Sequence, residues 1–268
     1  MGWQNPPVPW RAIEQALSDR RRAGRAHGGF GAGEKQHPDA ARYGPGADGG
    51  DSPAWSYKRP AYQASDIVRS SSRVAYAELH CHSSFSFLDG ASQPEELAEE
   101  AARLDLKALA ITDHDGFYGV VRFSEAAKAV GLPTIFGAEL TVDKLDISPG
   151  QSDPDGSHLL VLARDPKGYA ALARVISEAQ LAGEKGAPRF TMSDLDNWVD
   201  DAELNHWLVL TGCRKGAVPR ALEREGPAAA ANALGSLVDR FGRNNVAVEL
   251  WDHGAPLDSA RNDALVHL

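Results

Sequence analysis

The chain has 268 residues, a formal net charge of −9 and two cysteines, Cys81 and Cys213. That length suits one barrel-sized domain or two small ones, and no apolar run is long enough to span a membrane. Two cysteines make no disulfide framework, which fits a reducing, cytoplasmic setting. Residues 1–73 hold 11 basic and 7 acidic side chains, so residues 74–268 hold 17 and 30 and a net charge of −13. A body this acidic is not expected to hold nucleic acid by broad electrostatic attraction.

Residues 1–73 are predicted to be a weakly basic and mostly disordered extension. Ten glycines and seven prolines fall within the first 60 residues, so few aliphatic side chains remain to offset the chain entropy of folding. One short helix could form at 11–23. The basic triplet that ends it is interpreted as a solvated run, with contact to nucleic acid as the weaker alternative.

From Val74 onward, short β-prone runs alternate with amphipathic helical runs. Strands are expected at 74–80, 107–112, 133–142, 158–163, 206–211 and 245–250. Helices are expected at 93–104, 118–130, 166–181, 192–198, 216–225 and 227–242, with a further helix starting at 257. An acidic loop containing Pro and Gly is expected at 143–156, between the third and fourth strands.

Six strand-then-helix units in succession predict an α/β fold with a parallel, barrel-like sheet over residues 74–268. A flat, doubly wound sheet is the alternative. No Gly-x-Gly-x-x-Gly turn follows the first strand, so a dinucleotide site is not indicated.

The first strand ends in His80-Cys-His82, followed by a loop that contains Asp89. Side chains two apart on a strand project to the same side, so both imidazoles can reach one metal ion or two adjacent ions. In α/β folds the carboxyl ends of the strands are where chemistry is placed. A bare His-x-His is weak on its own, because such histidines are often surface residues.

Similar side chains follow later strands: His114, Glu139 and Cys213. His158 begins its strand instead of ending it, so strand geometry alone leaves its place in this cluster open. Each residue also has a plain structural interpretation: a turn histidine, an exposed edge carboxylate or a small buried cysteine. Together they form a donor set suited to zinc, manganese or iron.

Several divalent cations held together would suit phosphoester hydrolysis, because they clamp the phosphate and lower the pKa of a bridging water from ~15.7 to ~7. Asp113, next to His114, is placed to orient a ligand from behind, to accept a proton, or to bind metal directly. The sequence leaves these three roles open.

Several motifs in this region occur together in one known family. They are His80-Cys-His-Ser, Leu88-Asp-Gly, Ile111-Thr-Asp-His-Asp, Phe136-Gly-Ala-Glu-Leu, His158-Leu-Leu-Val-Leu-Ala, Leu210-Thr-Gly-Cys and Val248-Glu-Leu-Trp-Asp-His-Gly. Over about residues 74–268, this combination resembles the polymerase-and-histidinol-phosphatase (PHP) domain found at the amino terminus of bacterial C-family DNA polymerases. Within that group it is most similar to the error-prone, damage-induced homologues of the polymerase III α subunit.

The resemblance implies a distorted (β/α)7 barrel that holds up to three metal ions. By position, it implies seven ligands: His80, His82, Asp89, His114, Glu139, His158 and Cys213. The family usually adds an Asp-x-His pair on a strand after the helix that starts near Leu257, so the barrel is expected to be incomplete here. Asp252-His253 has the wrong spacing for that pair and is interpreted as part of a loop.

The resemblance also implies that the chain is a piece of a translesion DNA polymerase without the polymerase palm. DNA, deoxynucleotides and catalytic magnesium would then be bound by other domains, and a sliding clamp and a mutasome accessory protein would be partners. Two alternatives remain open: a free-standing phosphoesterase of the histidinol-phosphatase kind, which tends to have His where Asp89 stands, and a non-catalytic structural module.

Overall fold

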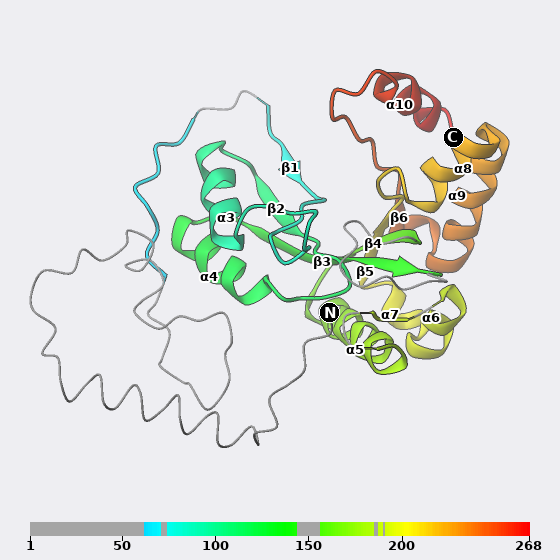
Figure 1. The fold of residues 1–268 in the computed structure, drawn as a ribbon, viewed down its shortest axis with the longest axis horizontal. Helices are drawn as coiled ribbons and strands as arrows, with labels where there is room; N and C mark the ends of the chain where they lie inside the picture. Colours follow the sequence, from blue (N-terminus) through cyan, green and yellow to red (C-terminus); the bar gives the residue numbers. More distant parts are fainter. Residues whose placement is uncertain (1–61, 71–73, 144–155, 185–186, 190) are drawn as a thin grey trace, which may run out of the picture. The chain divides into compact units, whose positions relative to one another are not determined.

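The computed structural model describes residues 62–70, 74–143, 156–184, 187–189 and 191–268 (Figure 1). Residues 62–268 form one compact unit. The helix expected at 11–23, most of the extension and most of the acidic loop lie outside the described residues. Within the described ranges, no helix is long and apolar enough to cross a membrane.

The centre of this unit is a six-stranded sheet whose strands lie side by side in chain order. They are β1 (Ala77–Glu78), β2 (Ala108–Ile111), β3 (Thr134–Val142), β4 (Ser157–Ala163), β5 (Trp207–Leu210) and β6 (Val246–Ala247). β1, β2 and β3 pair in parallel, as do β5 and β6, but β4 is antiparallel to both of its neighbours. The expectation of an all-parallel sheet is therefore wrong at one strand. A parallel neighbour needs a long, usually helical crossover, and the 143–156 connection carries no helical pattern.

The two edge strands are shorter than their apolar runs predicted. The runs at 74–80 and 245–250 each pair over two residues. An edge strand has a ladder on one side only, so its ends are easily diverted. Beyond β6, the Glu249 amide donates to the side-chain hydroxyl of Thr211 (2.9 Å). The chain thus leaves the ladder just before the rim of the sheet.

Helices flank the strands at nearly the predicted positions. They are α3 (Pro94–Arg103), α4 (Val120–Val130), α5 (Pro166–Ala182), α6 (Met192–Trp198), α7 (Asp201–Leu204), α8 (Ala217–Glu225), α9 (Pro227–Phe241), the 3-10 turn η2 (Arg243–Asn245) and α10 (Asp258–Val266). Figure 1 shows α3 and α4 beside β1 and β2, with α8 and α9 at the other end of the sheet. The short helices α7 and η2 were not predicted, since each is too brief to show an apolar period.

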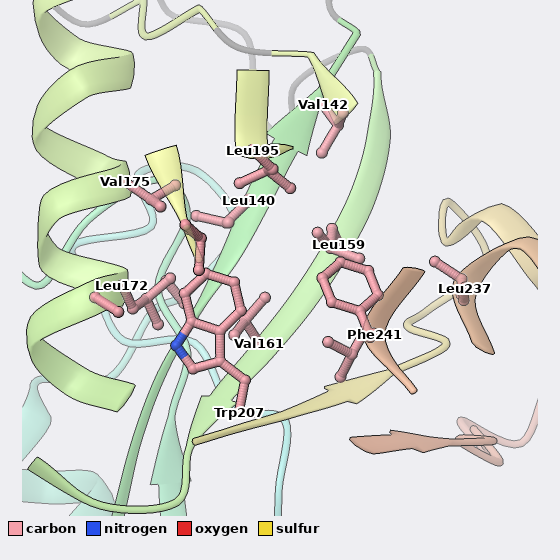
Figure 2. Packing of buried hydrophobic residues seen from close by; sticks show 14 of the residues in the cluster. Leu140, Val142, Leu159, Val161, Leu172, Val175, Leu195, Trp207, Leu237 and Phe241 are labelled. Atoms are coloured by element: carbon pink, nitrogen blue, oxygen red, sulfur yellow. The ribbon is translucent and has the colours of Figure 1, made fainter. Parts of the chain in front are cut away.

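The sheet curls around an apolar interior to which all the strands or their flanks contribute. The residues are Leu79, Ala110, Ile135, Leu160, Leu162, Leu208, Leu210 and Ala247. Because residues from both edge strands meet in this one cluster, the sheet forms an incomplete barrel, and the barrel-like α/β fold is confirmed. Outside it, Trp207 is fully buried between β4 and α5, close to Val161 and Leu172 (Figure 2).

Candidate metal centre

Glu139, on β3, is the centre of a cluster of side chains at one rim of the sheet. It is only 1% exposed although it is a carboxylate. His80 and His82, which follow β1, approach it from one side. His80 Nε2 lies 3.4 Å from Glu139 Oε1, and His82 Nε2 lies 3.2 Å from Oε2. The two imidazoles expected to share one side of the first strand therefore meet at a single carboxylate.

His114 reaches the same carboxylate from beyond the end of β2. An isolated parallel bridge between His114 and Glu139 extends the β2–β3 pairing toward the rim. His114 Nδ1 lies 3.4 Å from Glu139 Oε2. His114 thus lies at the rim where the carboxyl-end rule for parallel strands places it, and its role as a ligand stays a prediction.

His158 lies at the same rim although it stands at the beginning of β4. Because β4 runs antiparallel to β3 and β5, its first residues lie where the neighbouring strands end. His158 Nδ1 is 3.1 Å from Glu139 Oε1. Cys213, just after β5, places its sulfur 3.6 Å from Glu139 Oε1 and 3.6 Å from His158 Nδ1. The structure thus brings His158, whose place strand position alone left open, together with Cys213, which follows its strand as expected.

Asp89 joins the cluster from the loop after β1. Its Oδ2 contacts His82 Nδ1 and lies 3.3 Å from His114 Nε2. The side chain of Asp89 is 35% exposed, whereas the other six predicted ligands are buried or half-buried. Its neighbour Gly90 allows the loop to close, because a Cβ there would lie 1.9 Å from the Ser83 carbonyl oxygen.

Asp113 is buried beneath this loop and accepts three hydrogen bonds from it. The Ser83 amide donates to Oδ1 (2.7 Å), the Ser83 hydroxyl to Oδ2 (2.8 Å) and the Ser86 hydroxyl to Oδ1 (2.7 Å). Both carboxylate oxygens are therefore occupied by loop donors. Of the three roles left open by the sequence, this geometry favours the first, orientation of a ligand, which Asp113 would exert by holding the loop of Asp89.

Glu249 is a neighbour of the cluster that the sequence analysis missed. Its Oε1 lies 2.9 Å from His80 Nδ1. Like Glu139, it is a carboxylate near the end of an apolar run, and that position was the available signal. Asp252 and His253 lie in the following loop, as expected, and the His253 amide donates to Asp258 Oδ2 (2.9 Å).

The carboxylates control the protonation of the first two imidazoles. Burial lowers the pKa of His80, but Glu139 and Glu249 outweigh it and raise that pKa to about 9. Burial likewise lowers the pKa of His82, and Glu139 again shifts the balance upward. Burial raises the pKa of Glu139, but the surrounding imidazoles outweigh it and hold this carboxyl far below its usual range. Glu139 is therefore ionised near neutral pH.

The pKa of the third imidazole, that of His114, is shifted in the opposite direction. Burial lowers the pKa of His114 to about 4, and the neighbouring His82 and His158 rings add to this shift. So many imidazoles around one carboxylate cannot all be charged together, since like charges at this distance disfavour one another. His114 is therefore neutral near neutral pH and has a lone pair free for ligation.

Several buried polar atoms at the rim have no hydrogen-bond partner among the residues that the structure describes. They are His80 Nε2, His82 Nε2, His114 Nδ1 and Glu249 Oε2. Buried polar atoms normally find a partner, so a group of them aimed at one place indicates a ligand site. The donor atoms form three overlapping sets, each within 4.8 Å: His80, His82 and Glu139; His82, Asp89 and His114; and His114, Glu139 and His158. Imidazole and carboxylate donors at this spacing fit divalent metal ions.

The profile of the PHP domain matches residues 78–253. The chain belongs to the PHP domain family. This PHP chain is 51% identical over 269 residues to the error-prone DNA polymerase of Mycobacterium bovis. It is 45% identical over 312 residues to that of Nocardia farcinica. The resemblance to error-prone polymerases drawn from the motifs is thereby confirmed.

These alignments cover 100% of the PHP chain but only 22% and 26% of the two relatives. Among solved structures, a candidate metal-dependent phosphoesterase from Bifidobacterium adolescentis is similar at a TM-score of 0.38 and 20% identity. That match covers 72% of this chain and 83% of the other.

Proposed function

We propose that the rim of this PHP domain binds a cluster of divalent metal ions and hydrolyses phosphoesters. The arrangement around Glu139 carries the proposal. Imidazoles from His80, His82, His114 and His158 and the thiol of Cys213 all approach one buried carboxylate within 3.6 Å. Within the described part of the chain, three of these imidazole nitrogens have no hydrogen-bond partner. A protein rarely buries such a set without a cation to satisfy it.

His80, His82, Asp89, His114, Glu139, His158 and Cys213 would hold the ions. When bound, zinc, manganese or iron would supply a Lewis acid and a water of lowered pKa. Glu139 would serve as a shared ligand, because both of its oxygens have imidazoles close by. Asp113 would keep the Asp89 loop closed through its bonds to Ser83 and Ser86, with no part in proton transfer.

The relatives lead to a second, wider proposal. The whole protein would be an error-prone DNA polymerase that acts in translesion synthesis. DNA, deoxynucleotides, magnesium, the sliding clamp and an accessory protein would then be bound outside this chain. Support comes from 51% identity along the full chain to a protein of that name. The net charge of −13 over residues 74–268 also fits a domain that leaves broad DNA binding to other regions.

A structural role for the same metals is favoured by the distribution of the ligands over five strands of the sheet. They follow or lie on β1, β2, β3, β4 and β5, so an ion would tie together most of the sheet. Binding free energy at such a site contributes to folding. The two roles predict different outcomes in one experiment.

The test is hydrolysis of a chromogenic phosphodiester by the purified chain loaded separately with zinc, manganese and iron(II). We expect metal-dependent hydrolysis that falls to background in Glu139→Gln and His82→Ala. His253→Ala is the matched control, because it removes an exposed imidazole near the site but outside the cluster. Bound metal that raises the melting temperature without hydrolysis would favour the structural role. No metal binding would contradict both roles.

A further inference from the structure

Glu249 and His80 meet across the open side of the barrel. His80 follows β1 and Glu249 follows β6, the two edge strands of the sheet. Glu249 Oε1 lies 2.9 Å from His80 Nδ1, and the two side chains are 12% and 2% exposed. A carboxylate held at this distance from a buried ring nitrogen makes a charge-assisted hydrogen bond.

The surroundings fix both partners. The Glu249 amide donates to Thr211 Oγ1 (2.9 Å). The Trp251 ring meets the His80 ring edge-on, with centroids 4.8 Å apart at 73°. Asn262 in turn holds the backbone of Trp251, accepting from its amide (3.3 Å) and donating to its carbonyl oxygen (3.2 Å). The imidazole therefore has little freedom to rotate or flip.

The orientation and tautomer of the His80 ring decide which of its nitrogens can bind a metal. A carboxylate acceptor keeps a proton on Nδ1, because an ionised carboxylate can accept but not donate. Nε2 is then the nitrogen left for ligation. It lies 3.4 Å from Glu139 Oε1 and makes no hydrogen bond to any residue that the structure describes. Metal-binding histidines commonly have a carboxylate of this kind on the other ring nitrogen, which fixes the tautomer and raises the basicity of the ligand.

We propose that Glu249 is a positioning residue that holds a proton on His80 Nδ1 and aims His80 Nε2 into the metal centre. The effect on metal affinity rests on the proposed metal binding, whereas the proton on Nδ1 does not. Glu249 also links the two edges of the sheet, so its loss will cost some stability. The test therefore needs a readout that a purely structural link would not change.

That readout is the proton on His80 Nδ1, observed by nuclear magnetic resonance in the metal-free, ring-labelled chain. We expect a slowly exchanging Nδ1 proton, because burial and the carboxylate protect it. In Glu249→Ala the Nδ1 proton should lose this protection and exchange too fast to be observed, whereas Glu249→Gln should keep the signal, since the amide oxygen can still accept. Glu78→Ala is the matched control: Glu78 accepts from the His80 backbone amide (3.0 Å), a bond to the main chain and not to the ring.

The second readout is zinc affinity, measured by competition with a chromophoric chelator. Loss of such a carboxylate partner weakens metal binding roughly 10- to 100-fold, and we expect a loss in this range for Glu249→Ala. A smaller loss is expected for Glu249→Gln, and none for Glu78→Ala. A folded Glu249→Ala chain, checked by circular dichroism, is required for the comparison.

The two readouts separate the failure of each proposal. An Nδ1 proton that is absent from the unchanged chain, or that persists in Glu249→Ala, would overturn the positioning role. Unchanged zinc affinity in Glu249→Ala would also overturn it. If the unchanged chain shows the Nδ1 proton but binds no zinc, the proposed metal centre fails, and with it the effect of Glu249 on affinity.

Discussion

His158 Nδ1 lies 3.1 Å from Glu139 Oε1, although one residue begins its strand and the other lies well inside its own. The register of β3 and β4 explains the contact. Glu139 pairs with Leu160, so both project to the same face, and His158 is two residues from Leu160 on that face. Leu160 belongs to the interior of the barrel. The polar cluster thus forms the rim above an apolar interior.

A first prediction concerns His158. We expect His158→Ala to weaken zinc binding by about tenfold or more, since loss of even an indirect partner of a ligand costs that much. The measurement is competition with a chromophoric chelator. His206→Ala is the control, because His206 pairs with Asp165 (2.6 Å) at the opposite end of the strands. Equal affinities for the two variants would remove His158 from the metal centre.

A second prediction concerns Gly90, which lets the Asp89 loop approach the barrel. In Gly90→Ala the new Cβ would lie 1.9 Å from the Ser83 carbonyl oxygen, so the loop must open. We expect weaker zinc binding with little change in the cooperativity of unfolding. Gly235→Ala is the control, because it lies within α9 and an added Cβ would meet no described atom within 4 Å apart from its own helix turn. This change should stabilise the chain by about 0.5–1 kcal/mol.

If Gly90→Ala binds zinc as well as the unchanged chain does, the position of the Asp89 loop does not matter for the site. The role of Asp89 as a ligand would then be contradicted.

A third prediction concerns Asp113. Asp113→Ala leaves the Ser83 and Ser86 donors without their buried acceptor, and hydrogen bonds to a charged group are worth about 1.5–3 kcal/mol each. We expect a loss of roughly 3 kcal/mol or more in the free energy of unfolding, measured with denaturant. Asp263→Ala, at an exposed position in α10, should stay within about 0.5 kcal/mol. A loss no larger than that of the control would show that the loop is not anchored through Asp113.

A fourth prediction concerns pH. A metal ion competes with protons for its imidazole ligands. The pKa of His80 is raised to about 9, so this ring is protonated near neutral pH and must release a proton on ligation. The pKa of His114 is lowered to about 4, so that ring adds no pH dependence in the same range. Zinc affinity should therefore increase with pH, by about tenfold per pH unit for each proton released.

The check is calorimetry in two buffers of different ionisation enthalpy at a pH of about 7.5, within the range where the proton is released. We expect proton release on zinc binding, and less release in His80→Ala. Zinc binding without proton release would contradict the role of His80 as a ligand.

Much of the fold could be predicted from the sequence because local signals determine it. The period of the apolar residues placed α9 at 227–242, where the structure has Pro227–Phe241. Residues that follow parallel strands, such as His114, could be placed at the rim by a general rule. The direction of β4 was missed because its own apolar run does not specify it. The available signal was the 143–156 connection, which has no helical pattern for a parallel crossover. The doubt about His158 followed from this.

Glu249 was missed for a different reason. Its contact with His80 spans 169 residues and joins the two edge strands. No local pattern specifies which carboxylate will meet a given imidazole when a sheet curls. The short paired lengths of β1 and β6 were missed likewise, since apolar runs do not reveal where an edge strand leaves its ladder.

The central claim is that Glu139 organises a metal centre, and a count of bound metal tests it most directly. The chain would be dialysed against zinc, manganese or iron(II), and the metal per chain would be measured by mass spectrometry. We predict more than one divalent ion per unchanged chain and per His253→Ala control, and close to none in Glu139→Gln. An unchanged chain without metal, or a Glu139→Gln chain that binds as much as the unchanged one, would contradict the account.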